Sequence, residues 1–346
     1  MRVSSVITSI IVLIVASILL LESCRKKDRS FYKGTPLAFT IPAGFPQPVY
    51  DFAANPLTEE AFLLGRKLFY EGRLSVDSFH ACASCHQPDA AFTTFEHDLS
   101  HGVHNAHTLR NAPGLSNLAW YPAFMQDGRF SRLESVSLYH INAPNEMDEN
   151  LPAIVERLKA DTVYHRLFTA AYGDKYITNE RLLEALKQFV LGMVSANAKY
   201  DKVKRGEASF TATEQSGYAI FQSKCAACHK EPLFTDFSYR NIGLPLAPGL
   251  KDFGRMRVTG NSADSLKFRV PSLRNVMFTS YYSHDGRFSF VQRLLSHYRS
   301  GVVPSSTLDP LLAAGIQTTT TEETALIAFL RTLSDSSFLN NPRYRQ

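Results

Sequence analysis

Cysteine and tryptophan are scarce in this sequence, and neither sign of charge dominates it. The 346 residues include five cysteines and one tryptophan. Four of the cysteines stand in two short motifs, which leaves no pair for a structural disulfide. A hydrophobic share of 45% and a charged share of 20% exclude a disordered or fibrous class, and the length is sufficient for two domains with their own cores.

A short motif, Cys-x-x-Cys-His, occurs at residues 82–86 and again at residues 225–229. It is typical of c-type haem attachment, because two thiols one helical turn apart bond the haem vinyl groups and the adjacent histidine ligates the iron. A cysteine-rich zinc site or two redox-active dithiol pairs are the alternatives. Because each copy has its own histidine, we predict two covalent haem c groups. Their predicted attachment residues are Cys82, Cys85, His86, Cys225, Cys228 and His229.

The charge of the chain gives no indication of a nucleic-acid partner. The formal net charge is +5. Two haems would add four propionates, and 5 − 4 leaves a nearly neutral protein. We therefore expect no nucleic-acid binding.

The N-terminus is typical of a secretion signal. A short basic start, Met1-Arg2, precedes an apolar run over residues 6–21, and the run ends at Leu-Glu-Ser-Cys. This ending resembles the lipobox of bacterial lipoproteins, which predicts a signal peptide over residues 1–23 and lipidation of Cys24. An uncleaved transmembrane anchor is the alternative. Either way we expect the protein on the periplasmic side of a bacterial membrane, touching the membrane only through this anchor.

The remaining chain is predicted to be mainly helical and to form two tandem domains like class I cytochromes c, each with one covalent haem. We expect a Pro-rich tether over residues 24–50, an N-terminal haem domain over 51–205 and a C-terminal haem domain over 206–340. Apolar periodicity predicts helices at 57–70, 213–221 and 322–333. A further amphipathic helix at 181–200 is expected to lead into the domain junction.

A longer repeat follows each haem motif. The separation of Pro113 from Asp127 equals the separation of Pro271 from Asp285, and each aspartate begins an Asp-Gly-Arg-Phe-Ser run. A single Asp-Gly-Arg would be an ordinary turn. The matched spacing indicates two domains related by duplication.

These features together resemble the bacterial di-haem cytochrome c peroxidase and MauG family. They are the order and spacing of the two haem motifs, Arg-Asn-Ala-Pro at 110–113, the two Asp-Gly-Arg turns and Asn-Glu-Met at 145–147. The resemblance extends from near Leu57 to Leu333. It implies a peroxidatic haem in the N-terminal domain, an electron-transfer haem in the C-terminal domain and a calcium ion between them.

The resemblance implies that Glu146 is catalytic, because it follows Asp127 at the family's offset and stands in the family's Glu-Met pair. A haem that cleaves peroxide needs a group that moves a proton between the two oxygens. On residue type alone, a glutamate in this acidic stretch would be a solvated charge or a helix N-terminal acid.

A loop histidine caps the peroxidatic iron in part of the family, and three compete for that position here. They are His101, His104 and His107. Aligning the chain through Pro113 puts His104 next to the family's position, so His104 is the predicted distal ligand. If no histidine ligates, the first iron is permanently open, as in the MauG branch.

The distal ligand of the second haem distinguishes the branches of the family. Tyr298 follows His284 at the family's offset for this ligand, where cytochrome c peroxidases have methionine and the MauG branch has tyrosine. We therefore predict Tyr298 as the iron ligand, since a phenolate stabilises higher oxidation states. His297, Met277 and Met256 are the alternatives.

Two further implications concern the region between the haems. The family's calcium ligands correspond to the Asn111 side chain and to backbone carbonyls of Thr279 and Tyr281. The family's inter-haem tryptophan, by contrast, is replaced by Gln126, which cannot be oxidised as an indole can.

The function implied by the resemblance is reduction of hydrogen peroxide with electrons from a small periplasmic donor, a cytochrome c or a cupredoxin. The alternative is MauG-like oxidation of side chains on a partner protein. A second alternative is a non-enzymatic di-haem electron carrier with both irons six-coordinate.

Overall fold

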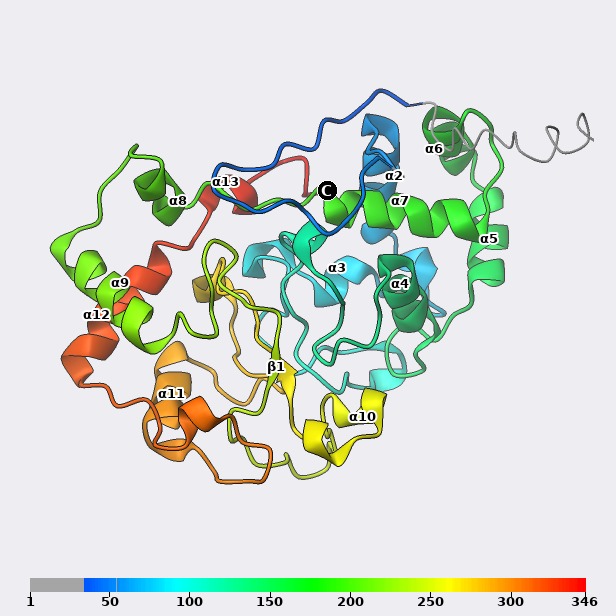
Figure 1. Ribbon diagram of the computed structural model, residues 1–346. Coiled ribbons are helices and arrows are strands. Elements are labelled where there is room, and N and C mark those ends of the chain that lie inside the picture. Colours follow the sequence, from blue (N-terminus) through cyan, green and yellow to red (C-terminus); the bar gives the residue numbers. More distant parts are fainter. Residues whose placement is uncertain (1–33, 54) are drawn as a thin grey trace, which may run out of the picture. The chain divides into compact units, whose positions relative to one another are not determined.

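Helices dominate residues 34–53 and 55–346, the part of the chain that the computed structural model describes (Figure 1). The longer helices are α2 (Glu59–Phe69), α4 (Leu133–Asn142), α5 (Leu151–Lys159), α6 (Thr162–Tyr172), α7 (Asn179–Leu191), α9 (Ala212–Lys224) and α12 (Thr320–Arg331). Shorter helices are α3 (Cys82–Cys85), α8 (Lys199–Lys204), α10 (Met256–Thr259), α11 (Val291–Ser296) and α13 (Ser336–Leu339). The strands β1 (Tyr239–Arg240) and β2 (Phe268–Arg269) pair antiparallel. The prediction of a mainly helical chain is confirmed.

Short 3₁₀-helical and π-helical turns connect these elements. The 3₁₀ turns are η1 (Gly72–Leu74), η2 (Pro88–Ala90), η3 (Val103–Asn105), η4 (Leu118–Trp120), η5 (Ser262–Asp264), η6 (Val276–Phe278) and η8 (Pro310–Leu312). One π-helical turn, η7, covers His297–Gly301. The predicted signal peptide and Cys24 lie outside the described residues. In the described part of the chain, no helix has the length and apolar character needed to cross a membrane.

Helix α2 begins where the sequence predicts and crosses α7 at a glycine. The Thr58 hydroxyl accepts a hydrogen bond from the Ala61 N–H at 3.3 Å and caps the helix. A Cβ on Gly65 would lie 1.9 Å from the Ala185 carbonyl oxygen on α7. The two helices can therefore pack this closely only because residue 65 has no side chain.

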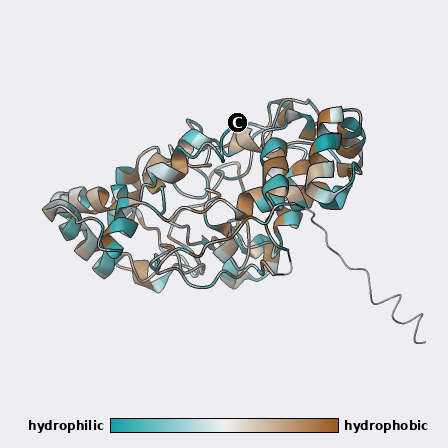
Figure 2. Ribbon diagram, turned by 90° about the horizontal axis from the view of Figure 1, so that it is seen from above, coloured by the Kyte–Doolittle hydropathy of each residue, from teal (hydrophilic) through white to brown (hydrophobic). Residues whose placement is uncertain are grey.

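Helices α9 and α12 repeat this crossing in the C-terminal half. A Cβ on Gly217 would lie 1.9 Å from the Ala325 carbonyl oxygen. Phe221 and Phe329 are fully buried beside the crossing, with ring centroids 5.0 Å apart. The helices of the described chain carry both hydrophilic and hydrophobic residues (Figure 2).

The helix predicted over residues 181–200 is shorter than expected and has a different role. It is α7, which ends at Leu191 and packs across α2 as the partner of that helix. The chain leaves the helical path because the side chain of Asn117 makes two hydrogen bonds with the backbone of Ser195. Its Oδ1 accepts from the Ser195 N–H at 2.9 Å, and its Nδ2 donates to the Ser195 carbonyl at 2.9 Å. Apolar periodicity continues through this stretch, but these buried hydrogen bonds hold it extended.

The Asp-Gly-Arg repeats fold alike. Gly128 and Gly286 have φ angles of +70° and +68°, a left-handed conformation that favours glycine. Each turn is closed by an isolated β-bridge, Phe124 with Phe130 and Tyr282 with Phe288. The shared backbone conformation agrees with the duplication inferred from the sequence spacing.

Segments at both ends of the described chain pack against the N-terminal half. Trp120 contacts Phe39 and Phe45 at centroid distances of 5.5 and 5.1 Å, so the described part of the expected tether is packed. At the other end, the Tyr70 hydroxyl donates to the Tyr344 carbonyl at 2.7 Å. The C-terminal residues therefore return to α2 (Figure 1).

Candidate haem-binding site

A cavity that is partly open to solvent lies beside the first Cys-x-x-Cys-His motif. Its apolar lining includes Phe69, Leu115, Leu118, Phe124, Leu133, Val136 and Val190. Arg257 and Arg269, from the C-terminal half of the chain, also line it. The cavity is therefore completed by residues from both halves.

The first motif has the geometry that covalent haem attachment needs. Helix α3 is a single turn that carries Cys82 and Cys85 at its ends, and both thiols are free. The His86 Nδ1–H donates to the Phe92 carbonyl at 2.9 Å. This bond fixes the ring and leaves Nε2 as the nitrogen available to a metal.

Burial keeps His86 in the form that can ligate iron. It lowers the pKa of His86 to about 4 and raises the pKa of the Cys82 and Cys85 thiols to about 12 and about 11. At neutral pH His86 is thus a neutral imidazole with a free lone pair. A large apolar cavity, two adjacent thiols and a neutral histidine fit a covalent haem.

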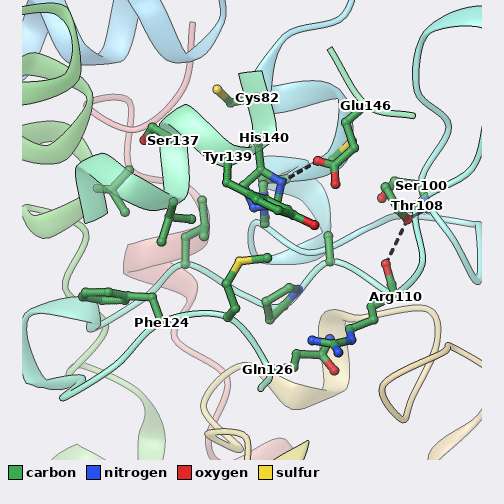
Figure 3. A pocket seen from close by; sticks show the side chains of 18 of the residues that line it. Cys82, Ser100, Thr108, Arg110, Phe124, Gln126, Ser137, Tyr139, His140 and Glu146 are labelled. Carbon is green, nitrogen blue, oxygen red and sulfur yellow. Dashed lines mark hydrogen bonds and ion pairs between the residues drawn. The ribbon is translucent and has the colours of Figure 1, made fainter. Parts of the chain in front are cut away.

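Glu146 lies in this cavity and is paired with a residue that the sequence analysis missed. Its Oε2 is 2.5 Å from Nδ1 of His140, on the last turn of α4 (Figure 3). Both side chains line the cavity, and both lie close enough to His86 for their charges to act on it. No sequence motif marks His140, because the pair forms only where the chain turns back after α4.

The three candidate distal histidines have different surroundings. His104 is not among the cavity-lining residues; its side chain is 62% exposed and its Nε2 lies 3.0 Å from the Asp148 carboxylate. His101 does line the cavity. Its ring lies between those of His97 and His107, with centroids 4.5 Å away on each side. In this arrangement His101, rather than His104, faces the site.

The second motif repeats the arrangement of the first. Its thiols are free, and Nδ1 of His229 lies 3.1 Å from the carbonyl oxygens of Phe234 and Pro271. Burial lowers the pKa of His229 and raises the pKa of Cys225 to about 12. His229 therefore has the same fixed ring and neutral form as His86, which fits a second haem.

Tyr298 lies near the second motif, on the π-helical turn η7. Burial raises the pKa of its phenol, and the nearby thiols of Cys225 and Cys228 raise it further. His297, the alternative ligand, uses its Nε2 to bond the Ile242 carbonyl at 2.9 Å. π-helical turns are rare and are frequently found at functional sites.

The residues expected to bind calcium lie in one region between the two halves. The Asn111 N–H donates to the His284 carbonyl at 2.9 Å, which joins Asn111 to the segment that carries Thr279 and Tyr281. The Tyr281 carbonyl accepts from the Thr279 hydroxyl at 3.1 Å. Within the described ranges, no group of three or more His, Cys, Asp or Glu side chains is arranged to hold a metal ion; that finding does not concern carbonyl ligands.

Gln126, at the position of the expected tryptophan, acts as a structural link. Its Nε2 donates to the Asn111 carbonyl at 2.7 Å, and its own backbone carbonyl accepts from the Arg269 N–H at 2.7 Å. The residue thus joins the Arg-Asn-Ala-Pro segment to β2. A side-chain amide provides the first of these hydrogen bonds, but it offers no redox-active group.

Comparison with known proteins gives a consistent result. The sequence profile of a family described as di-haem cytochrome c peroxidase matches residues 59–209. The methylamine utilization protein MauG of Methylophilus methylotrophus is 33% identical over 302 residues, covering 85% of this chain and 87% of that protein. The cytochrome c551 peroxidase of Nitrosomonas europaea is 34% identical, covering 68% and 71%.

A solved structure agrees with these relatives. The crystal structure of a MauG-like protein associated with microbial copper homeostasis superposes with a TM-score of 0.82 at 30% identity. The match covers 89% of this chain and 98% of that one.

Proposed function

Because this chain belongs to the di-haem cytochrome c peroxidase and MauG family, whose members are haem oxidoreductases acting on peroxide, we propose that it is a c-type peroxidase. It reduces hydrogen peroxide with electrons from a periplasmic cytochrome c or a similar small donor protein. The observation that carries the proposal is Glu146, a carboxylate in the same cavity as the first motif.

The chain's own residues have distinct roles in this proposal. A haem held at each motif supplies an iron that exchanges electrons and, at the first site, binds peroxide. Cys82 and Cys85 hold the first haem and His86 ligates it from one side. Glu146 takes a proton from one peroxide oxygen and returns it to the other. The apolar lining limits access of bulk water to the reacting oxygens.

The remaining site residues complete the proposal. Tyr298 would supply its phenol oxygen to the second iron and favour its higher oxidation states. Asn111 and the carbonyls of Thr279 and Tyr281 would hold a calcium ion. Of the three histidines considered as a resting cap on the first iron, His101 is better supported than His104 and His107, since it is the one of the three that lines the cavity.

MauG-like oxidation of side chains on a partner protein is the second candidate function. One observation favours it: the phenol of Tyr298 lies beside the second motif, which would let the second haem store an oxidising equivalent. Gln126, at the position of the expected redox-active tryptophan, weakens both enzymatic routes.

The location and domain plan are also proposed. The family is periplasmic in bacteria, and we place this protein there, held by a lipid on Cys24. The haem domains span residues 51–205 and 206–340.

Optical and EPR titration of the purified mature protein with hydrogen peroxide tests the enzymatic function. We expect a high-spin ferric component and a spectral change on adding peroxide, in the oxidised protein if the first iron is open at rest and after one-electron reduction if a histidine caps it. Two haems that stay six-coordinate and peroxide-inert in both states would show an electron carrier instead. Steady-state turnover with reduced cytochrome c would then favour the peroxidase over the MauG-like oxidase.

Substitution Glu146→Gln tests the proton-transfer role. The amide cannot accept the proton, so we expect the reaction with peroxide to slow by about 100-fold or more while both haems stay attached. Glu156→Gln is the matched control, because Glu156 is exposed on α5 and pairs with Lys159 at 2.7 Å. Equal rates for Glu146→Gln and the unsubstituted protein would remove Glu146 from the mechanism.

A further inference from the structure

The His140–Glu146 pair is the closest contact between ionisable side chains within the cavity. Nδ1 of His140 and Oε2 of Glu146 are 2.5 Å apart. The two side chains keep 32% and 17% of their surface exposed, so the pair is partly shielded from water. Figure 3 shows the imidazole directed at the carboxylate, with the second carboxylate oxygen left free of this contact.

The backbone of Glu146 is held, but its side chain depends on His140. The Glu146 N–H donates to the Ala143 carbonyl and the Glu146 carbonyl accepts from the Val103 N–H, each at 2.9 Å. These bonds fix the loop but leave the side-chain torsions of Glu146 free. In the described part of the chain, the hydrogen bond that reaches its carboxylate comes from His140.

The backbone of His140 is fixed by the helix that carries it. It lies on α4, and its ring meets the ring of Tyr139 in a T-shaped arrangement at a centroid distance of 5.5 Å. Tyr139 in turn packs against Phe130, with centroids 5.6 Å apart. A donor on a helix is more precisely placed than one on a loop.

We propose that His140 is a positioning residue for proton transfer by Glu146. The His140 Nδ1–H binds Oε2 and turns the carboxylate so that Oε1 faces the bound peroxide. Oε1 would accept a proton from one peroxide oxygen and return it to the other, which leaves as water when the O–O bond breaks. Two electrons from the reduced donor protein and two protons from solvent would then reduce the remaining oxygen to a second water. His140 acts only as the hydrogen-bond donor to Oε2. The inference rests on the proposed role of Glu146.

Cyanide binding to the ferric holoprotein tests the proposal without turnover. Hydrogen cyanide must lose its proton when cyanide binds ferric haem, so its association rate reports on a nearby proton acceptor. The rate is followed by stopped-flow absorbance at pH 7. His140→Phe keeps ring volume without a donor, His140→Ala removes both, and His140→Asn keeps an N–H near the position of Nδ1.

The expected pattern separates orientation from simple packing. Glu146→Gln binds cyanide about 100-fold more slowly than the unsubstituted protein. His140→Phe and His140→Ala slow binding by about tenfold or more, because the carboxylate loses a charge-assisted hydrogen bond. His140→Asn stays within about threefold of the unsubstituted rate. His165→Ala is the control and is expected to bind cyanide at the unsubstituted rate, because His165 lies on α6 and is not among the cavity-lining residues.

The outcomes separate the proton-transfer role of Glu146 from the positioning role of His140. If Glu146→Gln binds cyanide at the unsubstituted rate, the proposed role of Glu146 fails. If Glu146→Gln is slow while His140→Phe or His140→Ala is unchanged, only the positioning role fails. If His140→Asn is as slow as His140→Phe, the ring rather than its hydrogen bond matters, and the proposal is overturned. Haem content and circular dichroism identify any variant that does not fold. The test needs only one folded variant without the donor, either His140→Phe or His140→Ala.

Discussion

Tyr298 and His297 are neighbours on η7, and their surroundings differ. His297 is buried and its Nε2 bonds the Ile242 carbonyl, so its ring is already engaged. The Tyr298 phenol is close enough to Cys225 and Cys228 for those thiols to raise its pKa. A haem attached through the same two cysteines would lie beside this phenol.

Substitution Tyr298→Phe tests the ligand at the residue scale. Loss of the phenol oxygen removes the distal ligand, so we expect a new high-spin ferric signal from the second haem in the EPR spectrum. Both haems stay attached, because the thioether bonds are unaffected. His297→Gln serves as the comparison and is expected to leave the spin state unchanged. A low-spin second haem in Tyr298→Phe would contradict the assignment.

The two helix crossings, at Gly65 and Gly217, each require a residue without a side chain. In each, a carbonyl oxygen of the partner helix lies 1.9 Å from where a Cβ would be. A methyl group there can be accommodated only by moving a backbone, not by rotating a side chain. The same helix-packing arrangement thus occurs in both halves, as expected for duplicated domains.

Substitution Gly217→Ala is the prediction at this scale. Alanine favours an isolated helix by about 1 kcal/mol, but the clash with α12 outweighs that gain. We expect the free energy of unfolding to fall by about 1–3 kcal/mol, as for overpacked cores, measured by denaturant titration. The neighbouring exposed Ser216→Ala should stay within about 0.5 kcal/mol of the unsubstituted protein. Equal stability of the two variants would refute the close crossing.

At the scale of the whole molecule, Arg110 joins the two halves. Its guanidinium binds Asp127 at 2.9 Å and Asp252 at 2.6 Å, and both carboxylates are almost fully buried. Burial acts to raise the pKa of Asp252, but the hydrogen bonds and charge of Arg110 outweigh it and hold that pKa below its usual value. Because the folded-state pKa is lowered, this carboxylate adds stability above about pH 4 that is lost as the pH falls.

Substitution Arg110→Met tests this link. It leaves two buried carboxylates without their main partner, so we expect the free energy of unfolding at pH 7 to fall by about 3–5 kcal/mol. The difference from the unsubstituted protein should shrink as the pH falls below about 4, where Asp252 takes up a proton. Arg132→Met is the control, since Arg132 is 72% exposed and its bond to Glu134 contributes little. A loss of stability that does not depend on pH would contradict the argument.

Much of the fold follows from the sequence, and the exceptions have a common cause. The helices around Gly65 and Gly217 were predicted because apolar periodicity is local. The end of α7 was misjudged, because Asn117, far earlier in the chain than Ser195, draws that segment out of its helical path. No local pattern contains that contact.

The candidate site, like the fold, could be predicted from the sequence only in part. Sequence alone determined the haem-attachment residues and the mainly helical class, because thiols and histidine must stand at a set spacing within one turn of chain. It also indicated Glu146 and Tyr298 through their distance from other motifs. Only the tertiary structure decided that His140 meets Glu146, that His101 rather than His104 faces the cavity, and that the C-terminal half completes that cavity. The His140–Glu146 contact depends on how the chain turns back after α4, and the completed cavity depends on how distant segments meet in space. Residue spacing along a chain encodes neither.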